Sequence, residues 1–255
     1  MKPLKYENDK YEIFVQNHIF IKDKETNKYF RNKLSSIDSH SLKDFREYKE
    51  KISNFAFWSY ILFLIMMICF NNLYLLNLQK EIVPYFNAKI VIVLILYFIT
   101  NIVLHELGHI YSLKYFGKKF DKIGVKLNYL IFPAVFVQMN ETYMLSRIDK
   151  IVVHSAGIFI NFTIINIIQL INEFTLHSYT LSLAFIFFSS TMIWNLVPLL
   201  NSDGYKIMLA SLSLDEFSHV TKNHWLVIIF QTIGLLIALN TLIHWLIYWG
   251  LYFLS

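Results

Sequence analysis

The sequence has little charge and almost no cysteine. Only 16% of its 255 residues are Asp, Glu, Lys or Arg, whereas about 25% is usual for a soluble domain. The single cysteine, Cys69, lies in an apolar run, which excludes a disulfide framework within the chain and favours an inert, membrane-buried thiol. The first 50 residues are charged, so we expect no cleavable signal peptide.

Apolar residues are abundant and gathered in blocks. They make up 56% of the chain, above the roughly 45–50% that is typical of soluble domains. Five blocks reach the length of about 20 residues that a helix needs to cross a bilayer. They are residues 55–78, 90–115, 151–172, 179–197 and 225–251. The sequence therefore predicts an all-α polytopic membrane protein with about five transmembrane helices in a lipid bilayer.

Residues 1–52 form the one clearly soluble part of the sequence. Residues 1–51 carry 12 Lys or Arg against 9 Asp or Glu. Within them, 11–15, 18–21 and 28–31 have the composition of short strands, and the charged segment 39–51 predicts a helix. We expect residues 1–52 to be a small cytoplasmic segment that buries little core of its own.

The Lys-rich segment between the second and third apolar blocks alternates in polarity. Apolar residues occupy every second position, first at Ile123, Val125, Leu127 and Tyr129 and then, after Pro133, at Val135, Val137 and Met139. This period of two predicts a small β-hairpin at the membrane edge. Two interpretations stay open, a buried core hairpin and an edge that pairs with an extended peptide.

Two histidines and a glutamate lie inside the second apolar block. His105 and His109 are four residues apart, so on a helix they project from one face, where two imidazoles can grip one divalent ion, usually Zn²⁺. Glu106 follows the first histidine, where a carboxylate can act as a general base toward water. A chance match is the alternative, but three polar side chains in an apolar run are costly unless they are paired or bound. The sequence therefore predicts a metal site.

A hydrolytic zinc site usually has three protein ligands and one open position, so a third ligand is needed. Asp203 is the only acidic residue between positions 174 and 214. Pro198 ends regular helix before it, and Gly204 after it allows the backbone to bend and aim the carboxylate inward. An ordinary Asp-Gly turn is the alternative, in which case Glu141 is the substitute ligand.

The basic residues predict an orientation in the membrane. With the N-terminus inside, the three inner segments hold 12, 7 and 2 Lys or Arg, and the outer segments hold only Lys80 and Lys89. This asymmetry favours a cytoplasmic N-terminus and puts the histidine pair and Asp203 at similar depth towards the cytoplasmic face. Because topology accounts for the net charge of +5, we expect no nucleic-acid partner.

Three motifs, in this order, resemble those of the site-2 protease family of intramembrane zinc metalloproteases. They are His105-Glu106-Leu107-Gly108-His109, Gly157-Ile158-Phe159-Ile160-Asn161, and Asn195-Leu196-Val197-Pro198 followed by Asp203-Gly204. The compact build is most similar to the small bacterial peptide zinc metalloproteases. Two positions depart from the family pattern. Ser202 stands where the family often has Leu or Phe, and Ile158 stands where it often has Pro.

The resemblance implies hydrolysis of peptide bonds within or beside the membrane. His105, His109 and Asp203 would be the zinc ligands, Glu106 the catalytic base, and Asn161 would help to hold substrate or the oxyanion. An interhelical hydrogen bond is the alternative role of Asn161. The metalloprotease domain would span residues 53–255, with its core at 90–206.

The expected substrate is a membrane-inserted or membrane-associated peptide or single-span protein, in bacterial peptide maturation or regulated intramembrane proteolysis. One rival function is a non-hydrolytic immunity or export partner for a secreted peptide that retains the fold. Another is a transporter with the same polar residues along an ion path. Neither rival has a particular need for Glu106 beside His105, so the intact motif favours the enzyme.

Overall fold

The computed structural model describes residues 3–36, 43–128, 132–199, 201–216 and 223–254. Its strands are β1 (Leu4–Glu7), β2 (Tyr11–Val15), β3 (His18–Asp23), β4 (Tyr29–Lys33), β5 (Arg46–Glu47), β6 (Lys122–Asn128) and β7 (Phe132–Gln138). Its α-helices are α1 (Asn54–Glu81), α2 (Ala88–Tyr115), α3 (Arg147–Ile171), α4 (Tyr179–Leu196), α5 (Asp203–Leu212) and α6 (Trp225–Leu254). Short turns of other helix types are η1 (Leu34–Ser36), η3 (Asn140–Met144) and η4 (Asn172–Leu176).

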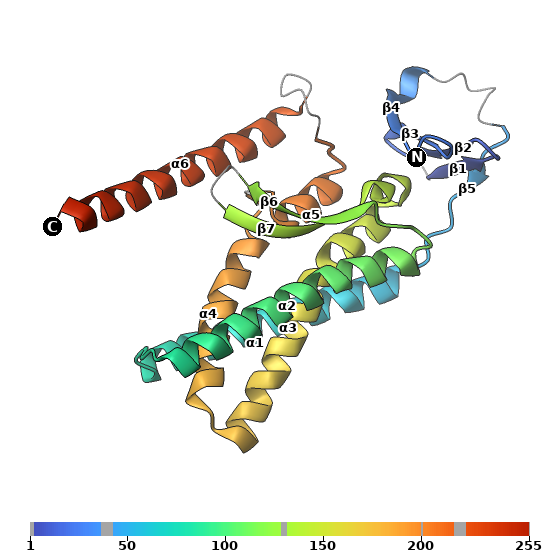
Figure 1. Cartoon of the computed structure of the whole chain (residues 1–255). Coiled ribbons are helices and arrows are strands. Elements are labelled where there is room, and N and C mark those ends of the chain that lie inside the picture. The colour runs from blue at the N-terminus through green and yellow to red at the C-terminus, as the bar shows by residue number, and fades with distance from the viewer. Residues whose placement is uncertain (1–2, 37–42, 129–131, 200, 217–222, 255) are drawn as a thin grey trace.

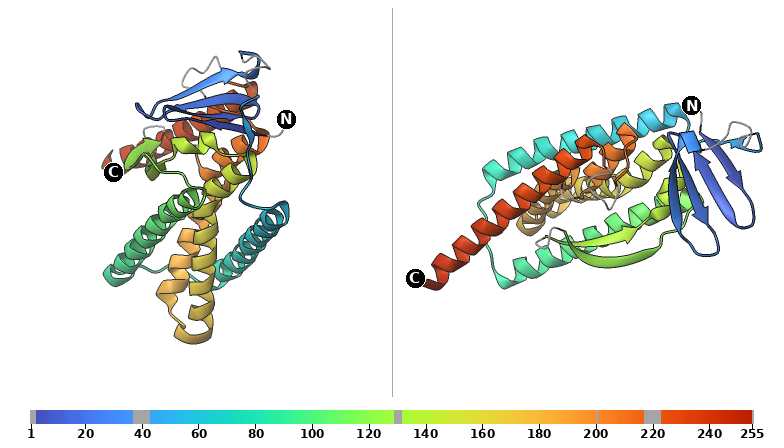
Figure 2. Two further views of the ribbon diagram at one scale, coloured as in Figure 1. Left: turned by 90° about the vertical axis from the view of Figure 1, so that its right-hand side faces the viewer. Right: turned by 90° about the horizontal axis from the view of Figure 1, so that it is seen from above.

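The N-terminal strands form an antiparallel sheet in the order β4-β3-β2-β1-β5, seen at one end of the helices in Figures 1 and 2. Local side-chain bonds explain two of its turns. Asn8 Oδ1 accepts from the backbone N–H groups of Lys10 and Tyr11. Asp23 Oδ1 accepts from the backbone of the following turn in the same way, which is the usual action of Asn and Asp in tight turns.

The predicted fold is confirmed only in part: the protein is mostly helical, but it is not all-α, because this sheet adds far more β structure than one hairpin. Strands expected at 11–15, 18–21 and 28–31 correspond to β2, β3 and β4, with shifts at the ends of β3 and β4. The other two strands, with four and two residues, are too short to show a period of two. The helix expected at 39–51 is also wrong over the described residues 43–51, where β5 pairs with β1.

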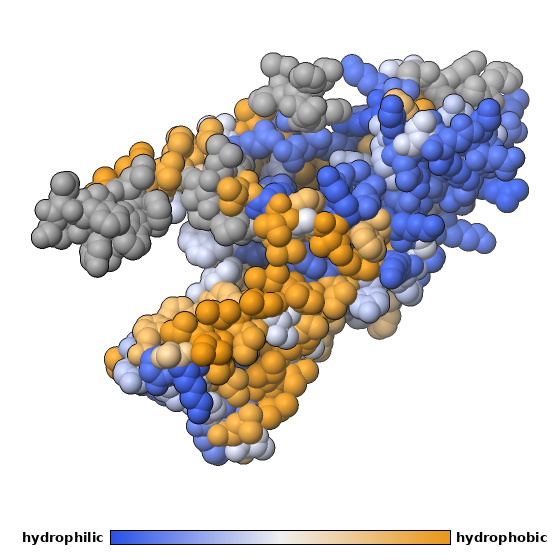
Figure 3. Space-filling view, viewed as in Figure 1, coloured by the Kyte–Doolittle hydropathy of each residue, from blue (hydrophilic) through white to orange (hydrophobic). Residues whose placement is uncertain are grey.

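Within the part of the chain that the structure describes, five helices are long and apolar enough to span a membrane, in agreement with the five apolar blocks of the sequence. Three of them begin at a side-chain cap, since Ser53, Asn87 and Ser146 each accept a hydrogen bond from the first turn that follows. In Figure 3 apolar side chains cover the helices and polar ones cover the sheet. This division suits a protein that is half in lipid and half in water.

Helices α1 to α4 pack together around an apolar core that includes Leu64, Phe162 and Phe185. Within this core Asn71 on α1 donates to Asn166 on α3 and to Ser189 on α4. Such bonds fix neighbouring helices where no water competes for the polar groups. Helix α6 extends apart from this bundle in Figure 1.

The predicted hairpin is confirmed as β6 and β7, with Ile123 opposite Val137 and Val125 opposite Val135. Val137 and Met139 pack against the end of α2 around Leu113. Along β6, by contrast, Ile123, Val125 and Leu127 are exposed. The apolar face of the hairpin is therefore buried at Val137, near the end of α2, and exposed along β6.

The sheet is fastened to the segment between α2 and α3 by buried charges as well as by apolar contact. Phe14 and Phe20 pack against Met144. Lys118 Nζ donates to Glu12 Oε1 at 2.6 Å, and these side chains belong to residues only 8% and 5% exposed. Burial alone would raise the pKa of Glu12, but the positive charges of Lys118 and Lys5 lower it below its ordinary value.

Replacing Lys118 by Met should loosen this attachment. The change leaves the Glu12 carboxylate buried with only Lys5, whose Nζ lies 3.0 Å away, and breaking a buried ion pair typically costs about 3–5 kcal/mol. We expect the midpoint of thermal unfolding in detergent to fall by roughly 5–10 °C. Lys119→Met at the adjacent, exposed position is the matched control. An equal effect of the two variants would mean that the pair does not hold the sheet.

Candidate metal centre

Helices α2 and α5 bring three candidate ligands together in the protein interior. The Nε2 atoms of His105 and His109 lie 3.2 Å apart, as expected for residues one turn apart on α2. Asp203, at the start of α5, places Oδ2 at 2.7 Å from the first of these nitrogens and 3.3 Å from the second. All three residues are buried. Among the described residues, these three form the group of side chains that could hold a metal ion.

The spacing of these atoms suits a tetrahedral ion. Ligand bonds of about 2.0–2.1 Å at tetrahedral angles put neighbouring donor atoms about 3.3–3.4 Å apart. The two separations of His109 Nε2, 3.2 and 3.3 Å, agree with this value. The 2.7 Å between His105 Nε2 and Asp203 Oδ2 is hydrogen-bond length and would open by a few tenths of an ångström. The residues present therefore fit Zn²⁺, and the donor set of two imidazoles and one carboxylate is one that zinc accepts.

Hydrogen bonds on the far side of each imidazole orient the pair. His109 Nδ1 lies 2.8 Å from the carbonyl oxygen of Val153 on α3. A proton on Nδ1 leaves the lone pair of Nε2 directed at the candidate site. The choice of tautomer follows from this acceptor, because a carbonyl oxygen cannot donate.

Asn161 on α3 lies beside the other imidazole, with Nδ2 at 3.2 Å from His105 Nδ1. Its Oδ1 has no partner among the described residues. Turning the amide over would let Oδ1 accept from Nδ1–H of His105 and fix that ring as Val153 fixes the other. These contacts assign Asn161 an orienting position next to a candidate ligand; its predicted contact with substrate stays a prediction.

Asp203 is held by its own neighbours in the chain. Ser202 caps α5, since its Oγ accepts from the backbone N–H of Tyr205, so the departure from the family pattern at this position serves to start the helix. Asn195 donates to Asp203 Oδ2 at 3.0 Å and accepts from the Asp203 backbone N–H at 3.2 Å. This role of Asn195 was not predicted, although the Asn-x-x-Pro motif pointed to the residue.

Electrostatics favour the ionised form of this carboxylate. Burial would raise the pKa of Asp203, but the neighbouring charges of His109 and His105 and their hydrogen bonds lower it well below the ordinary range. Lys206 Nζ, 3.6 Å from Oδ1, adds a positive charge on the outer side. The ionised carboxylate that these neighbours favour is the form that binds a metal.

Glycines at three helix contacts let the elements come this close. A Cβ atom on Gly204 would lie 2.0 Å from the carbonyl oxygen of Leu196, and one on Gly108 would lie 3.0 Å from that of Ala156. A Cβ on Gly157 would lie 2.6 Å from His109 Nε2 and 2.7 Å from His105 Nε2. Gly157 thus packs directly against both candidate ligand atoms, where any side chain would collide with them.

The remaining acidic candidates differ in position. Glu106 is half-buried on α2, and its carboxylate interacts electrostatically with both histidines and with Asp203. Glu141 instead forms an ion pair with Lys22 and accepts from the backbone N–H of Lys119. It serves the junction with the sheet and is not the substitute ligand.

The fold and the site together define a protein with membrane-length helices and a buried group of two histidines and one aspartate that can hold a metal. The chain is 54% identical over 249 residues to a Bacillus subtilis (strain 168) protein named "Putative peptide zinc metalloprotease protein YydH". The match covers 97% of this chain and 99% of that protein. The chain belongs to the YydH family. No family model matches the sequence, and no solved structure matches it.

Proposed function

We propose that the protein is an intramembrane zinc metalloendopeptidase that cuts a membrane-inserted or membrane-associated peptide. The observation that carries the proposal is the convergence of His105, His109 and Asp203, with Glu106 on the next helical position. The name of the Bacillus subtilis relative gives independent support for a peptide substrate and for zinc. Membership of the site-2 protease family remains part of the proposal, supported by the three sequence motifs.

His105, His109 and Asp203 would hold the zinc ion. When bound, zinc would act as a Lewis acid toward water and toward the scissile carbonyl. Glu106 takes a proton from the attacking water and delivers it to the leaving nitrogen, so one carboxylate serves both halves of the reaction. Asn161 and Val153 keep the imidazoles in the required orientation, and Asn195 does the same for the aspartate.

The proposed enzyme occupies the membrane with its N-terminus in the cytoplasm and its active site towards the cytoplasmic face. The distribution of Lys and Arg supports this orientation. The catalytic domain would comprise residues 53–255, with its core at 90–206, and residues 1–52 would be a cytoplasmic attachment. The rival function, a non-hydrolytic immunity or export partner, predicts metal binding without any cleavage.

Removing the metal should stop the reaction reversibly. We expect the purified protein in detergent to cut apolar peptides, to lose this activity by at least 100-fold with a chelator, and to regain it when Zn²⁺ is added back. Mass spectrometry of the products would follow each step. Mg²⁺, a cation that prefers oxygen ligands, is the control addition. Cleavage that continues at the same rate without metal would rule out this mechanism.

The exposed strand β6 is the proposed guide for the substrate. A transmembrane helix hides its peptide bonds in its own hydrogen bonds, so it must be unwound and held extended before it can be cut. A strand edge can do this by pairing with the peptide backbone.

Val125→Pro should therefore reduce cleavage about tenfold or more, because proline removes a backbone donor and interrupts the strand. Val125 is 74% exposed, so little packing is lost. Val125→Thr keeps the N–H and the branched side chain, and it is expected to cut at nearly the normal rate. Equal rates for the two variants at equal metal content would remove β6 from the substrate path.

A further inference from the structure

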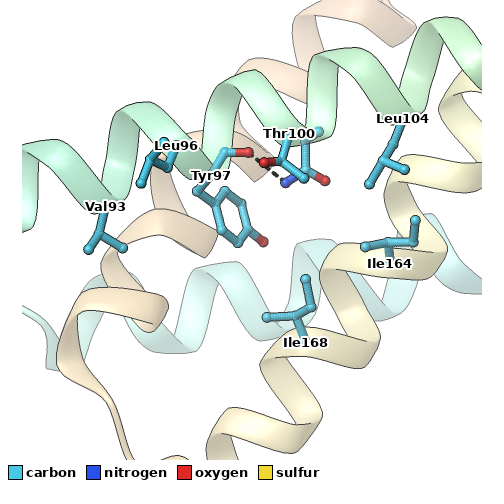
Figure 4. A pocket seen from close by; sticks show the side chains of 8 residues that line it. Val93, Leu96, Tyr97, Thr100, Leu104, Ile164 and Ile168 are labelled. Atoms are coloured by element: carbon cyan, nitrogen blue, oxygen red, sulfur yellow. Dashed lines mark hydrogen bonds between the residues drawn. The ribbon is translucent and has the colours of Figure 1, made fainter.

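A cavity with no role in the proposed mechanism lies along α2, beside the candidate metal centre. This cavity, of about 230 Å³, opens between α2 and α3. Figure 4 shows Val93, Leu96 and Leu104 on α2 facing Ile164 and Ile168 on α3, with the ring of Tyr97 directed from α2 into the space between them. A cavity of about 150 Å³ can hold benzene, so this one has room for a large apolar side chain.

Two polar atoms in this apolar setting lack partners. The Tyr97 hydroxyl has no hydrogen-bond partner within the described ranges, and neither has Asn101 Oδ1. Both residues are buried, at 9% and 2% exposure. The amide nitrogen of Asn101 is already used, because it donates to the Tyr97 carbonyl oxygen at 2.9 Å. One donor and one acceptor are thus left beside the cavity, an arrangement that is costly unless a ligand supplies the complementary groups.

The cavity is in line with the candidate metal centre. Tyr97, Asn101 and His105 are four residues apart in turn, so they share one face of α2. At about 1.5 Å of rise per residue, Asn101 is about 6 Å and Tyr97 about 12 Å from His105 along the helix. The β6–β7 hairpin packs at the opposite end of α2, around Leu113. The order along the helix is therefore cavity, metal centre, hairpin.

An extended peptide advances about 3.3 Å per residue. A chain held against the hairpin and passing the metal centre would therefore bring its second to fourth residues beyond the cut level with the cavity. Each peptide unit carries one N–H and one C=O, the complement of the two unpaired atoms. The rim of the cavity includes exposed Leu96, which leaves a way in from the lipid side.

We infer that the cavity between α2 and α3 is a substrate subsite, in which Tyr97 and Asn101 hydrogen-bond the backbone of an unwound apolar peptide whose large apolar side chain fills the space. This inference rests on the proposed protease function. It predicts that the enzyme selects the substrate residue two to four positions from the cut bond. This residue lies on the opposite side of the cut from the part of the peptide that pairs with the hairpin.

The test uses the full chain in detergent and a mixed library of synthetic apolar peptides of about 20 residues, a membrane-spanning length. Products are sequenced by mass spectrometry. Wild-type protein should prefer Leu or Phe over Ala at one position two to four residues from the cut. Ile168→Trp fills the cavity and should reduce that preference at least tenfold. Ile167→Trp, one residue away and 50% exposed, is the matched control and should leave it unchanged.

A second variant keeps the packing intact. Tyr97→Phe removes only the hydroxyl and should lower kcat/KM three- to tenfold, the range expected for one hydrogen bond. Tyr111→Phe, at an exposed position of the same helix, is its control. In the inactive Glu106→Gln background, Tyr97→Phe should raise the Kd of a fluorescent library peptide by a similar factor, which gives a readout apart from turnover.

The outcomes separate the two proposals. If no peptide is cut in a Glu106-dependent manner, the proposed function fails and the subsite fails with it. If Glu106-dependent cleavage occurs but Ile168→Trp and Tyr97→Phe leave the sequence preference and the Kd unchanged, only the subsite is overturned. If the two variants change only how activity depends on the chain length of the detergent, and not the sequence preference or the Kd, the cavity is a lipid site. That result would likewise overturn the subsite.

Discussion

Glu106→Gln should abolish peptide cleavage while leaving the metal in place. Gln has the shape of Glu but cannot take up a proton at neutral pH, and proton transfer by a positioned side chain contributes about 10²–10⁴-fold to rates. Because the same carboxylate would act in attack and in departure of the amine, we expect a loss of at least about 10³-fold in kcat. Zinc content and thermal unfolding should not change, since Glu106 is not a ligand in the proposed site.

The measurement is a product assay by mass spectrometry, both with the purified protein and with membrane peptides from cells. Glu81→Gln, an exposed position at the end of α1, is the matched control and should cut like the wild type. Peptide profiles that are the same for the wild type and Glu106→Gln would instead support the non-hydrolytic rival.

Gly157→Ala should empty the metal centre without replacing any of the three candidate ligands. The new methyl group would lie 2.6 Å from His109 Nε2 and 2.7 Å from His105 Nε2, well inside van der Waals contact. The two imidazoles would have to move away from this methyl group, and His109 could do so only by losing its hydrogen bond to the Val153 carbonyl oxygen. We expect zinc content below about one-tenth of the wild-type value, and loss of activity with it.

Gly124→Ala is the matched control for this change. Its methyl group would meet the ring of Phe136, at 3.0 Å, and neither residue is a candidate ligand. It should retain both zinc and fold. A Gly157→Ala protein with a full complement of zinc would show that α3 does not approach the site as closely as described.

The site was more predictable from the sequence than the fold around it. The spacing of His105 and His109 fixes their common face on any helix, and the motif with its neighbouring Pro198 singled out Asp203 across almost 100 residues. The carbonyl of Val153 could not be found in this way, since every residue has one. Its role depends on the approach of α3, which is a property of packing.

The N-terminal sheet, in contrast to the metal site, could be predicted from the sequence only in part. Strands β1 and β5 have four and two residues, too few to show the alternation of polar and apolar side chains that marks a strand. They form by pairing, since β1 pairs with the recognisable strand β2 and β5 pairs with β1. The ion pair of Glu12 with Lys118 joins residues 106 positions apart. Nothing local in the sequence distinguishes such a partner from any other lysine, so the attachment of the sheet had to come from the structure.

Metal analysis of the purified protein tests the central claim most directly, because every step of the proposal depends on Asp203 joining the two histidines around one ion. Elemental analysis combined with X-ray absorption should find one zinc per chain in the wild type, with nitrogen and oxygen ligands at about 2.0–2.1 Å. Asp203→Ala should lower that content at least tenfold, while Asp215→Ala, an acid outside the cluster, should leave it intact. Full zinc content in Asp203→Ala, or none in the wild type, would contradict the account.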